Sequence, residues 1–307
     1  MKNKIKFLYP HIYKFIESCP LSDNELITQN GVVKNDKLQC ALSNFINEIE
    51  QNYDNITKNT FNYKNNLELK RLSENNSKSK KLLFFYQLSE DIYNVIATLN
   101  NPYPNNQDLY FKLAYNGIQQ FRAITTLYLT GCDYSIIPLF RTLYENLIIF
   151  LFLAKHPELQ SDFIDHIYVN YHTVQENSQS AATESKSDFD YAVDNHLEGF
   201  DKTYGWTAKV IKKKTDRKLE YMANEVGLSS YSTVYKLACN FVHSSSLAIT
   251  VSVEKPEEDI TNLFLEATID LIVEHLITLA KKVSISNTSN IIILNILYHI
   301  KDEFMKS

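Results

Sequence analysis

Apolar residues recur with helical spacing along most of this chain. Leu38, Leu42 and Phe45, for example, fall on one face of a helix and predict an amphipathic element there. The same reasoning predicts helices over residues 38–53, 82–99, 108–130, 133–154, 158–180, 216–226, 231–243, 261–284 and 291–304. Segment 247–253 alternates, but no partner strand is evident, so we expect extended chain there. The pattern therefore predicts an all-α, multi-helix bundle.

Turn-forming and polar residues divide this pattern. The two prolines of Asn100-Pro-Tyr-Pro end one predicted helix, and Pro138 fits the first turn of another. Residues 55–81 are rich in Asn, Lys and Ser, and form either a frayed polar helix or a linker. We place a boundary there. It separates an N-terminal arm with a helical extension (1–81) from a helical bundle domain (82–307).

Composition excludes several common classes of enzyme. The 307 residues include only six glycines, and the signatures of Rossmann enzymes, P-loop NTPases and α/β-hydrolases are absent. Hydrophobic residues make up 44% of the chain, which argues against disorder. The formal net charge is −5 and the longest basic run is residues 212–214, so a broad phosphate-binding surface is not indicated.

Cysteine usage and the N-terminus indicate a cytoplasmic protein. The four cysteines lie far apart without a CxxC pair, which favours reduced thiols over structural zinc or disulfides. Residues 1–15 lack the apolar region and cleavage site of a signal peptide. The most apolar run, Leu147 to Ala154, has eight residues, whereas a membrane span needs about 20. We expect no membrane association, no cofactor and no metal.

The helix predicted over residues 133–154 is apolar nearly all round, which is typical of a central buried helix. Its only charges after residue 135 are Arg141 and Glu145, four residues apart on one face. Burying either charge alone is costly, so we expect a buried pair that other polar groups join. The Arg-before-Glu order is the weaker one for a surface pair, which favours a tertiary role.

A second group of polar residues within an otherwise apolar stretch follows near residue 243. His243 lies in an apolar setting before three serines that can cap or hydrogen-bond, and we expect it to contact Arg141 or Glu145. The supporting residues that we expect are Asn240, Tyr144 and Ser244. The cluster has two interpretations. It is an anion or phosphodiester site, with Arg141 neutralising charge, His243 as general acid/base and Glu145 orienting it. Alternatively, and in our view preferably, it is a polar network that fixes helix register.

These motifs resemble those of a known bacterial family. Residues 131–145 end in Arg-Thr-Leu-Tyr-Glu, and Trp206, Met222-Ala-Asn-Glu-Val-Gly, Tyr231-x-x-x-Tyr235 and Val242-His243-Ser-Ser follow in order. This arrangement, over roughly residues 116–252, resembles the uncharacterised family of domain of unknown function 5677. One departure is Asn240 in the stretch Ala-Cys-Asn, where that family more often has a serine ahead of Val-His. The resemblance implies an all-helical domain in which the motifs converge, and no activity.

The same helical make-up is reminiscent of HEPN-type domains, many of which serve toxin or antiphage systems and some of which cleave RNA. Those ribonucleases have a histidine within about six residues of an arginine. No His follows Arg122, Arg141 or Arg217 at that spacing. A standard HEPN site is therefore absent, and only a rearranged site of Arg141 and His243 could replace it.

Three weaker patterns remain. Lys212, Lys213 and Arg217 lie in the main basic cluster and are the candidate phosphate ligands, although such a cluster is usually a solvated face. Asp162 and His166 are spaced as metal ligands on one helix, with Asp165 and His172 nearby, but no Glu-x-x-His pair supports a metal centre. The tyrosines 168, 171, 221, 231 and 235 could stack nucleic-acid bases, but we expect core or half-buried packing.

Two functions follow from these patterns. The first is a helical module of a bacterial defence or stress system that acts through protein association, with a second copy or a partner protein. The second is a metal-independent, HEPN-like ribonuclease or toxin effector that uses Arg141 and His243, with RNA as its ligand. The low basic charge and the missing HEPN spacing favour the first.

Overall fold

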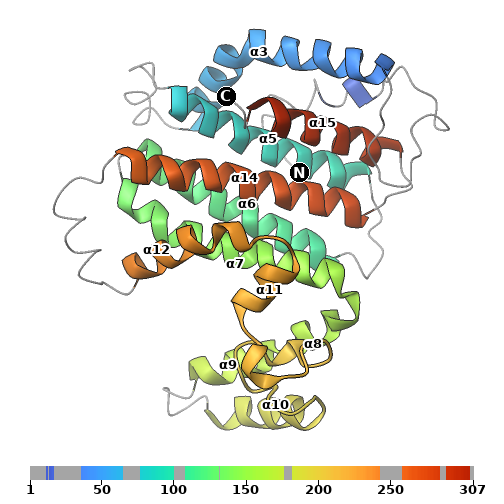
Figure 1. Cartoon of the computed structure of the whole chain (residues 1–307), viewed down its shortest axis with the longest axis vertical. Coiled ribbons are helices and arrows are strands. Elements are labelled where there is room, and N and C mark those ends of the chain that lie inside the picture. The colour runs from blue at the N-terminus through green and yellow to red at the C-terminus, as the bar shows by residue number, and fades with distance from the viewer. Residues whose placement is uncertain are drawn as a thin grey trace. The chain divides into compact units, whose positions relative to one another are not determined.

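The computed structural model describes most of the chain. The ranges are residues 12, 14–16, 36–64, 77–99, 108–130, 132–175, 182–242, 258–283 and 288–304. Every regular element within these ranges is helical and none is a strand, which confirms the all-α class (Figure 1). The alternating segment 247–253 lies outside them.

The described chain forms two compact units. The first comprises residues 1–147 and 233–307, and the second comprises residues 148–232. Helices of the first are α3 (Asp36–Lys64), α5 (Ser77–Leu99), α6 (Asp108–Leu129), α12 (Ser232–Val242), α14 (Glu258–Val283) and α15 (Thr288–Phe304). Helices of the second are α8 (Gln160–Asp165), α9 (Ile167–Gln175), α10 (Ala182–Asp194) and α11 (Leu219–Glu225). Helix α7 (Ile136–Lys155) passes from the first unit into the second.

Long helices with apolar faces build the first unit. Helix α14 packs against α5, α6 and α15, and α3 covers α5 (Figure 1). The run 82–88 in α5 is buried on all sides, because α3, α6 and α14 all pack on that helix. Phe121 of α6, Phe140 of α7 and Phe264 of α14 have no exposed surface and fill the space between these helices. The predicted extension is therefore part of the same packed core as α5.

Helix α7 combines a short 3-10 entry with a long apolar body. Residues Asp133–Ser135 form the 3-10 turn, and Pro138 lies in the first turn of α7, as predicted. Among the described helices, α7 is the one whose length and composition would allow it to cross a membrane, and 61% of that stretch is buried inside the protein. Burial of this kind fits the central helix predicted from its pattern.

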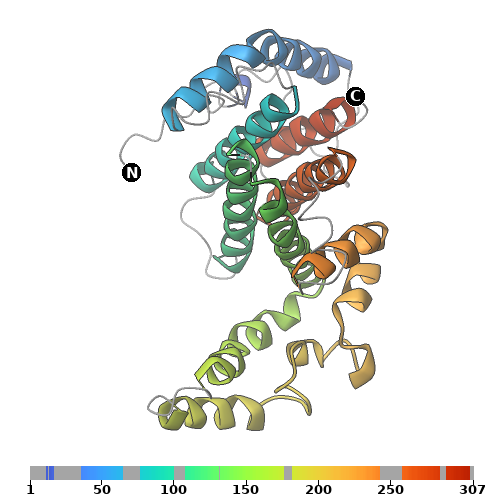
Figure 2. The ribbon, with the colours of Figure 1, turned by 90° about the vertical axis from the view of Figure 1, so that its left-hand side faces the viewer.

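The second unit consists of short helices joined by 3-10 turns at Pro157–Leu159, Gly205–Thr207, Lys214–Asp216 and Ser229–Tyr231. Its core gathers around Trp206, whose ring lies 5.0 Å from that of Phe163 and 6.1 Å from that of Phe152. Helices α9 and α10 run side by side (Figure 2). The sequence did not predict α10, because its 13 residues include few apolar side chains.

Candidate functional site

The predicted Arg141–Glu145 pair is present on α7. The Arg141 Nη2 atom lies 2.9 Å from Glu145 Oε1. The prediction that both side chains are buried is wrong, since 29% of Arg141 and 26% of Glu145 stay exposed. This face of α7 meets the polar side of α12, which leaves part of the guanidinium in water.

Tyr235 of α12 is the main partner of this pair. Its hydroxyl donates a hydrogen bond to Glu145 Oε1 at 2.7 Å, and the Arg141 guanidinium carbon lies 5.8 Å from its ring centre. The buried Tyr144 packs its ring 5.2 Å from that of Tyr235, which supports the contact. From the sequence, Tyr235 was predicted to be a core or half-buried packing residue. The available signal was its place in the motif Tyr231-x-x-x-Tyr235, which does not tell which residues it contacts.

Within this cluster, the positive charge of Arg141 is compensated by the negative charge of Glu145. Burial, then the hydrogen bond to Glu145, raises the pKa of Tyr235, so the phenol keeps its proton at neutral pH. Hydrogen bonding to Tyr235 and the charge of Glu145 together outweigh burial and raise the pKa of Arg141. The Arg141 Nε atom is buried without a hydrogen-bond partner. Because Glu145 pairs with Arg141, an anion that bound Arg141 would have to compete with Glu145. The hydrogen bond from Tyr235 to Glu145 links α12 to α7.

The remaining predicted members of the cluster do not join it in the described part of the chain. His243 and Ser244 lie outside the described residues. Asn240 is exposed, and its amide donates to the carbonyl of Lys236 on its own helix at 3.3 Å. Tyr235, and not Asn240, contacts the Arg141–Glu145 pair among the described residues, and the supporting role of Asn240 beside His243 stays a prediction.

The basic cluster of the second unit contains one arginine with a structural position. Arg217 donates from Nε to the carbonyl of Ile211 at 3.0 Å and from Nη1 to the carbonyl of Glu198 at 2.8 Å. Gly199 has φ of 82°, and a Cβ there would lie 3.0 Å from Arg217 Nη1, so glycine suits this close approach. Lys212 and Lys213 are exposed. Their phosphate-binding role stays a prediction. Two N–H groups of Arg217 already donate to backbone carbonyls.

The histidines that were weighed and not chosen as metal ligands have other partners. His166 Nε2 lies 2.9 Å from the Lys202 carbonyl, and burial lowers the pKa of this imidazole. His172 packs its ring 4.5 Å from that of Phe189. Within the described ranges, no three His, Cys, Asp or Glu side chains come together in a way that could hold a metal ion.

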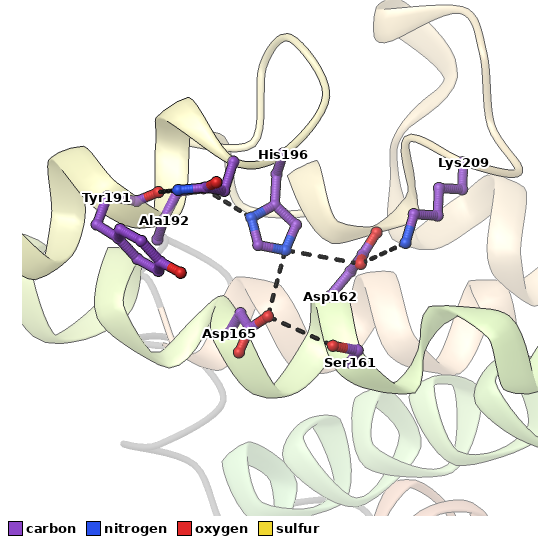
Figure 3. Close-up of polar contacts among 8 residues, drawn as sticks. Ser161, Asp162, Asp165, Tyr191, Ala192, His196 and Lys209 are labelled. Carbon is purple, nitrogen blue, oxygen red and sulfur yellow. Dashed lines mark hydrogen bonds and ion pairs between the residues drawn. The ribbon is translucent and has the colours of Figure 1, made fainter.

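Asp162 and Asp165 instead meet His196 and Lys209 (Figure 3). His196 Nε2 lies 3.3 Å from Asp165 Oδ2 and 3.6 Å from Asp162 Oδ1, and its Nδ1 lies 2.7 Å from the Ala192 carbonyl. Lys209 Nζ donates to the buried Asp162 at 2.7 Å. This network joins α8, the end of α10 and the segment after Trp206, and it compensates a carboxylate that would otherwise be costly to bury.

A second ion-pair network links the end of α7 to α11. His156 Nε2 lies 2.6 Å from Glu225 Oε1, and Lys155 Nζ lies 3.2 Å from the same oxygen. Burial alone would raise the pKa of Glu225, but the hydrogen bonds from His156 and Lys155 outweigh it and lower that pKa. The contact is structural, since it fixes both helix ends.

The first unit contains a buried histidine that the sequence analysis missed. His275 of α14 is fully buried, with Nδ1 2.8 Å from the Leu271 carbonyl and Nε2 3.2 Å from the amide nitrogen of Asn146. Burial lowers the pKa of His275 to about 4, so the ring is neutral. A Cβ on Gly117 would come within 2.7 Å of this ring, so α6 can approach α14 only with glycine there.

A line of apolar side chains on α8 and α9 remains in water. We call it the α8–α9 stripe; it comprises Ile164, Ile167, Tyr168, Tyr171 and Val174, with exposed fractions of 53, 60, 40, 57 and 76%. On the opposite side, Asp162, His166 and Val169 are buried. Tyr168, Tyr171 and Tyr221 were predicted as core or half-buried packing residues, and their exposed fractions of 40, 57 and 43% exclude the core position. The prediction is confirmed for Tyr231 and Tyr235.

Comparison with known families adds an identity without an activity. Residues 107–260 match the family described as Family of unknown function (DUF5677), which is half of the chain, and the chain belongs to this family. The match runs from α6 to the start of α14 and includes the whole second unit. No curated protein and no solved structure matches the chain. The resemblance seen in the sequence motifs is confirmed, whereas its HEPN-like character gains no support.

Proposed function

We propose that this chain is a helical module that acts by binding a protein through the α8–α9 stripe, without catalysis of its own. The stripe is the single observation that carries the proposal. Monomeric proteins scatter exposed apolar side chains singly, and a contiguous line of them marks an interaction surface. Tyrosine and isoleucine also suit interfaces, since they add large contact area with few rotatable bonds.

The geometry of the second unit supports this use of the stripe. Asp162, His196 and Lys209 tie α8 to the rest of the unit on its opposite side. The helix therefore presents its apolar face from a fixed position, which reduces the ordering cost of binding.

The catalytic alternative has less support from the described residues. In a ribonuclease, the charge of Arg141 would stabilise a phosphodiester, yet Glu145 Oε1 already compensates that charge at 2.9 Å. Arg217 directs two donors to carbonyls of its own unit. The HEPN-like ribonuclease or toxin role of Arg141 and His243 stays a prediction, as does the bacterial defence or stress context of the module.

Site-specific photocrosslinking in cells tests the proposal. Tyr171 is replaced by benzoylphenylalanine, and we expect a discrete adduct after irradiation because the ring would lie against the bound protein. The matched control carries the same group at Tyr221, which is exposed on α11 outside the stripe.

Adding Ile167→Glu to the Tyr171 variant should abolish the adduct, because a carboxylate within the apolar contact is costly. Adduct formation no stronger at Tyr171 than at Tyr221 would overturn the proposed function.

A further inference from the structure

The spacing of the α8–α9 stripe is that of a helix-pairing seam. Ile164, Ile167, Tyr171 and Val174 follow one another at intervals of three, four and three residues. This is the repeat with which one helix packs its side chains between those of another helix. His166 separates the two helices: its amide donates to the carbonyl of Asp162 in α8 at 3.0 Å, and its carbonyl accepts from the amide of Asn170 in α9 at 3.1 Å, so the seam runs over two consecutive helices. The stripe therefore fits a helical partner.

Charge indicates which helical partner fits. The positions beside the seam are Ser161, Phe163, Tyr168 and Asn170, none of which is charged. Charged residues at these flanking positions normally select a different partner or repel an identical one. Asp165, which follows Ile164 in the chain, faces His196 at 3.3 Å. Two identical stripes can therefore meet without opposing like charges, although the chain carries a formal net charge of −5.

The exposed area is also sufficient for a modest dimer. Side chains of this size have on the order of 150–250 Å² of surface each, so five that are about half exposed leave roughly 500 Å² in water. Two copies would bury about 1,000 Å² from the stripes alone, which reaches the lower limit for a specific interface.

From these three observations we propose that a second copy of this chain covers the stripe, through pairing of α8–α9 with α8–α9 around a two-fold axis. This proposal rests on the proposed function and names its partner. A two-fold axis places the same surface on both sides and closes the assembly at two copies. For an interface of this size we expect a dissociation constant on the order of micromolar.

Sedimentation velocity over a concentration series tests the dimer with the full chain. The wild type should approach twice the monomer mass of 35.6 kDa as its concentration rises through the micromolar range. The variant Ile167→Glu/Tyr171→Glu should remain monomeric, because four carboxylates would meet in the seam. The variant Ile167→Lys/Tyr171→Lys should also remain monomeric, because four ammonium groups would meet in the seam.

Mixing the two charged variants gives the decisive measurement. Opposite charges then face one another, so the mixture should regain the dimer that each variant alone has lost. A loss caused by misfolding would not be rescued in this way. Tyr221→Glu and Leu263→Glu, at exposed apolar positions outside the stripe, are the matched controls and should dimerise as the wild type does.

The outcomes separate this inference from the proposed function. A wild type that stays monomeric, a dimer that survives in both charged variants, or a mixture that is not rescued overturns the self-pairing. If the Tyr171 photoadduct then has a mass other than that of two copies, the stripe binds a different protein and the proposed function stands. If no adduct forms, both fail.

Discussion

Each of the two units of this protein is stabilised internally by a different kind of contact. In the first, long helices bury continuous apolar faces, and the fully buried polar ring of His275 is neutral. In the second, four short helices depend on polar contacts that join distant segments, such as Asp162 with Lys209 and His156 with Glu225. The first unit has ion pairs as well, for example Lys301 with Asp270, in addition to its continuous apolar faces. Apolar periodicity organises the first unit, and pairwise contacts organise the second.

This difference separates the two candidate sites. The Arg141–Glu145–Tyr235 cluster links α7 to α12 through side chains whose charges are compensated within the cluster. The second unit has a smaller apolar interior and yet leaves Ile167 and Tyr171 in water. A unit with little apolar surface to spare that exposes such side chains is the more informative place to look for function.

Trp206→Ala should produce the largest loss of stability, and the loss should be confined to the second unit. The single tryptophan fills the core of the second unit, and its loss should lower the free energy of unfolding there by about 3–5 kcal/mol. Hydrogen exchange measured by mass spectrometry should show faster exchange in residues 159–232 and little change in α5 and α14. Equal acceleration in both units would contradict the division.

Acid should weaken the first unit through His275. Its folded-state pKa of about 4 lies below the usual 6.5, so the unfolded state binds a proton that the folded state does not. Stability is therefore unaffected above about pH 6.5, falls as the pH drops from there to about 4, and loses about 3 kcal/mol in total. Urea unfolding followed by circular dichroism should show this slope, and His275→Gln should remove it. An unchanged slope in the variant would exclude this residue as the cause.

Arg217→Met should destabilise the second unit by about 2 kcal/mol, because the carbonyls of Ile211 and Glu198 each lose a hydrogen-bond donor. Lys212→Met is the matched control at an exposed position and should change the free energy of unfolding by less than about 0.5 kcal/mol. Urea unfolding followed by Trp206 fluorescence measures both. Equal effects of the two substitutions would indicate that Arg217 lies on a solvated face, as its basic neighbours suggested.

Tyr235→Phe should give the smallest effect, a loss of about 1 kcal/mol, because it removes one hydrogen bond to Glu145 and keeps the ring packing. Tyr221→Phe, at an exposed ring on α11, is the control. Thermal unfolding of the full chain measures both variants. A Tyr235→Phe protein as stable as its control would show that water replaces the hydroxyl without loss.

The sequence predicted the first unit well and the second poorly, for a physical reason. Helices α6, α7 and α14 repeat apolar residues over 20 or more positions, so periodicity alone fixes their place and nearly their ends. Helix α10 and the turns around Trp206 depend on contacts such as Arg217 with Glu198, which no local pattern encodes. The Arg141–Glu145 pair was predictable because both residues lie on one helix. Tyr235 was not, since it meets them from 90 residues further along the chain.

The insertion of residues 148–232 between two parts of the first unit has a consequence for biosynthesis. Helix α6 ends at Leu129, but α14, which packs against it, begins only at Glu258. At typical rates of translation, that interval lasts on the order of ten seconds. During this time the ribosome-bound chain presents the apolar faces of α5 and α6 without their final cover. The nascent protein should therefore be a substrate for chaperones until α14 has emerged from the exit tunnel.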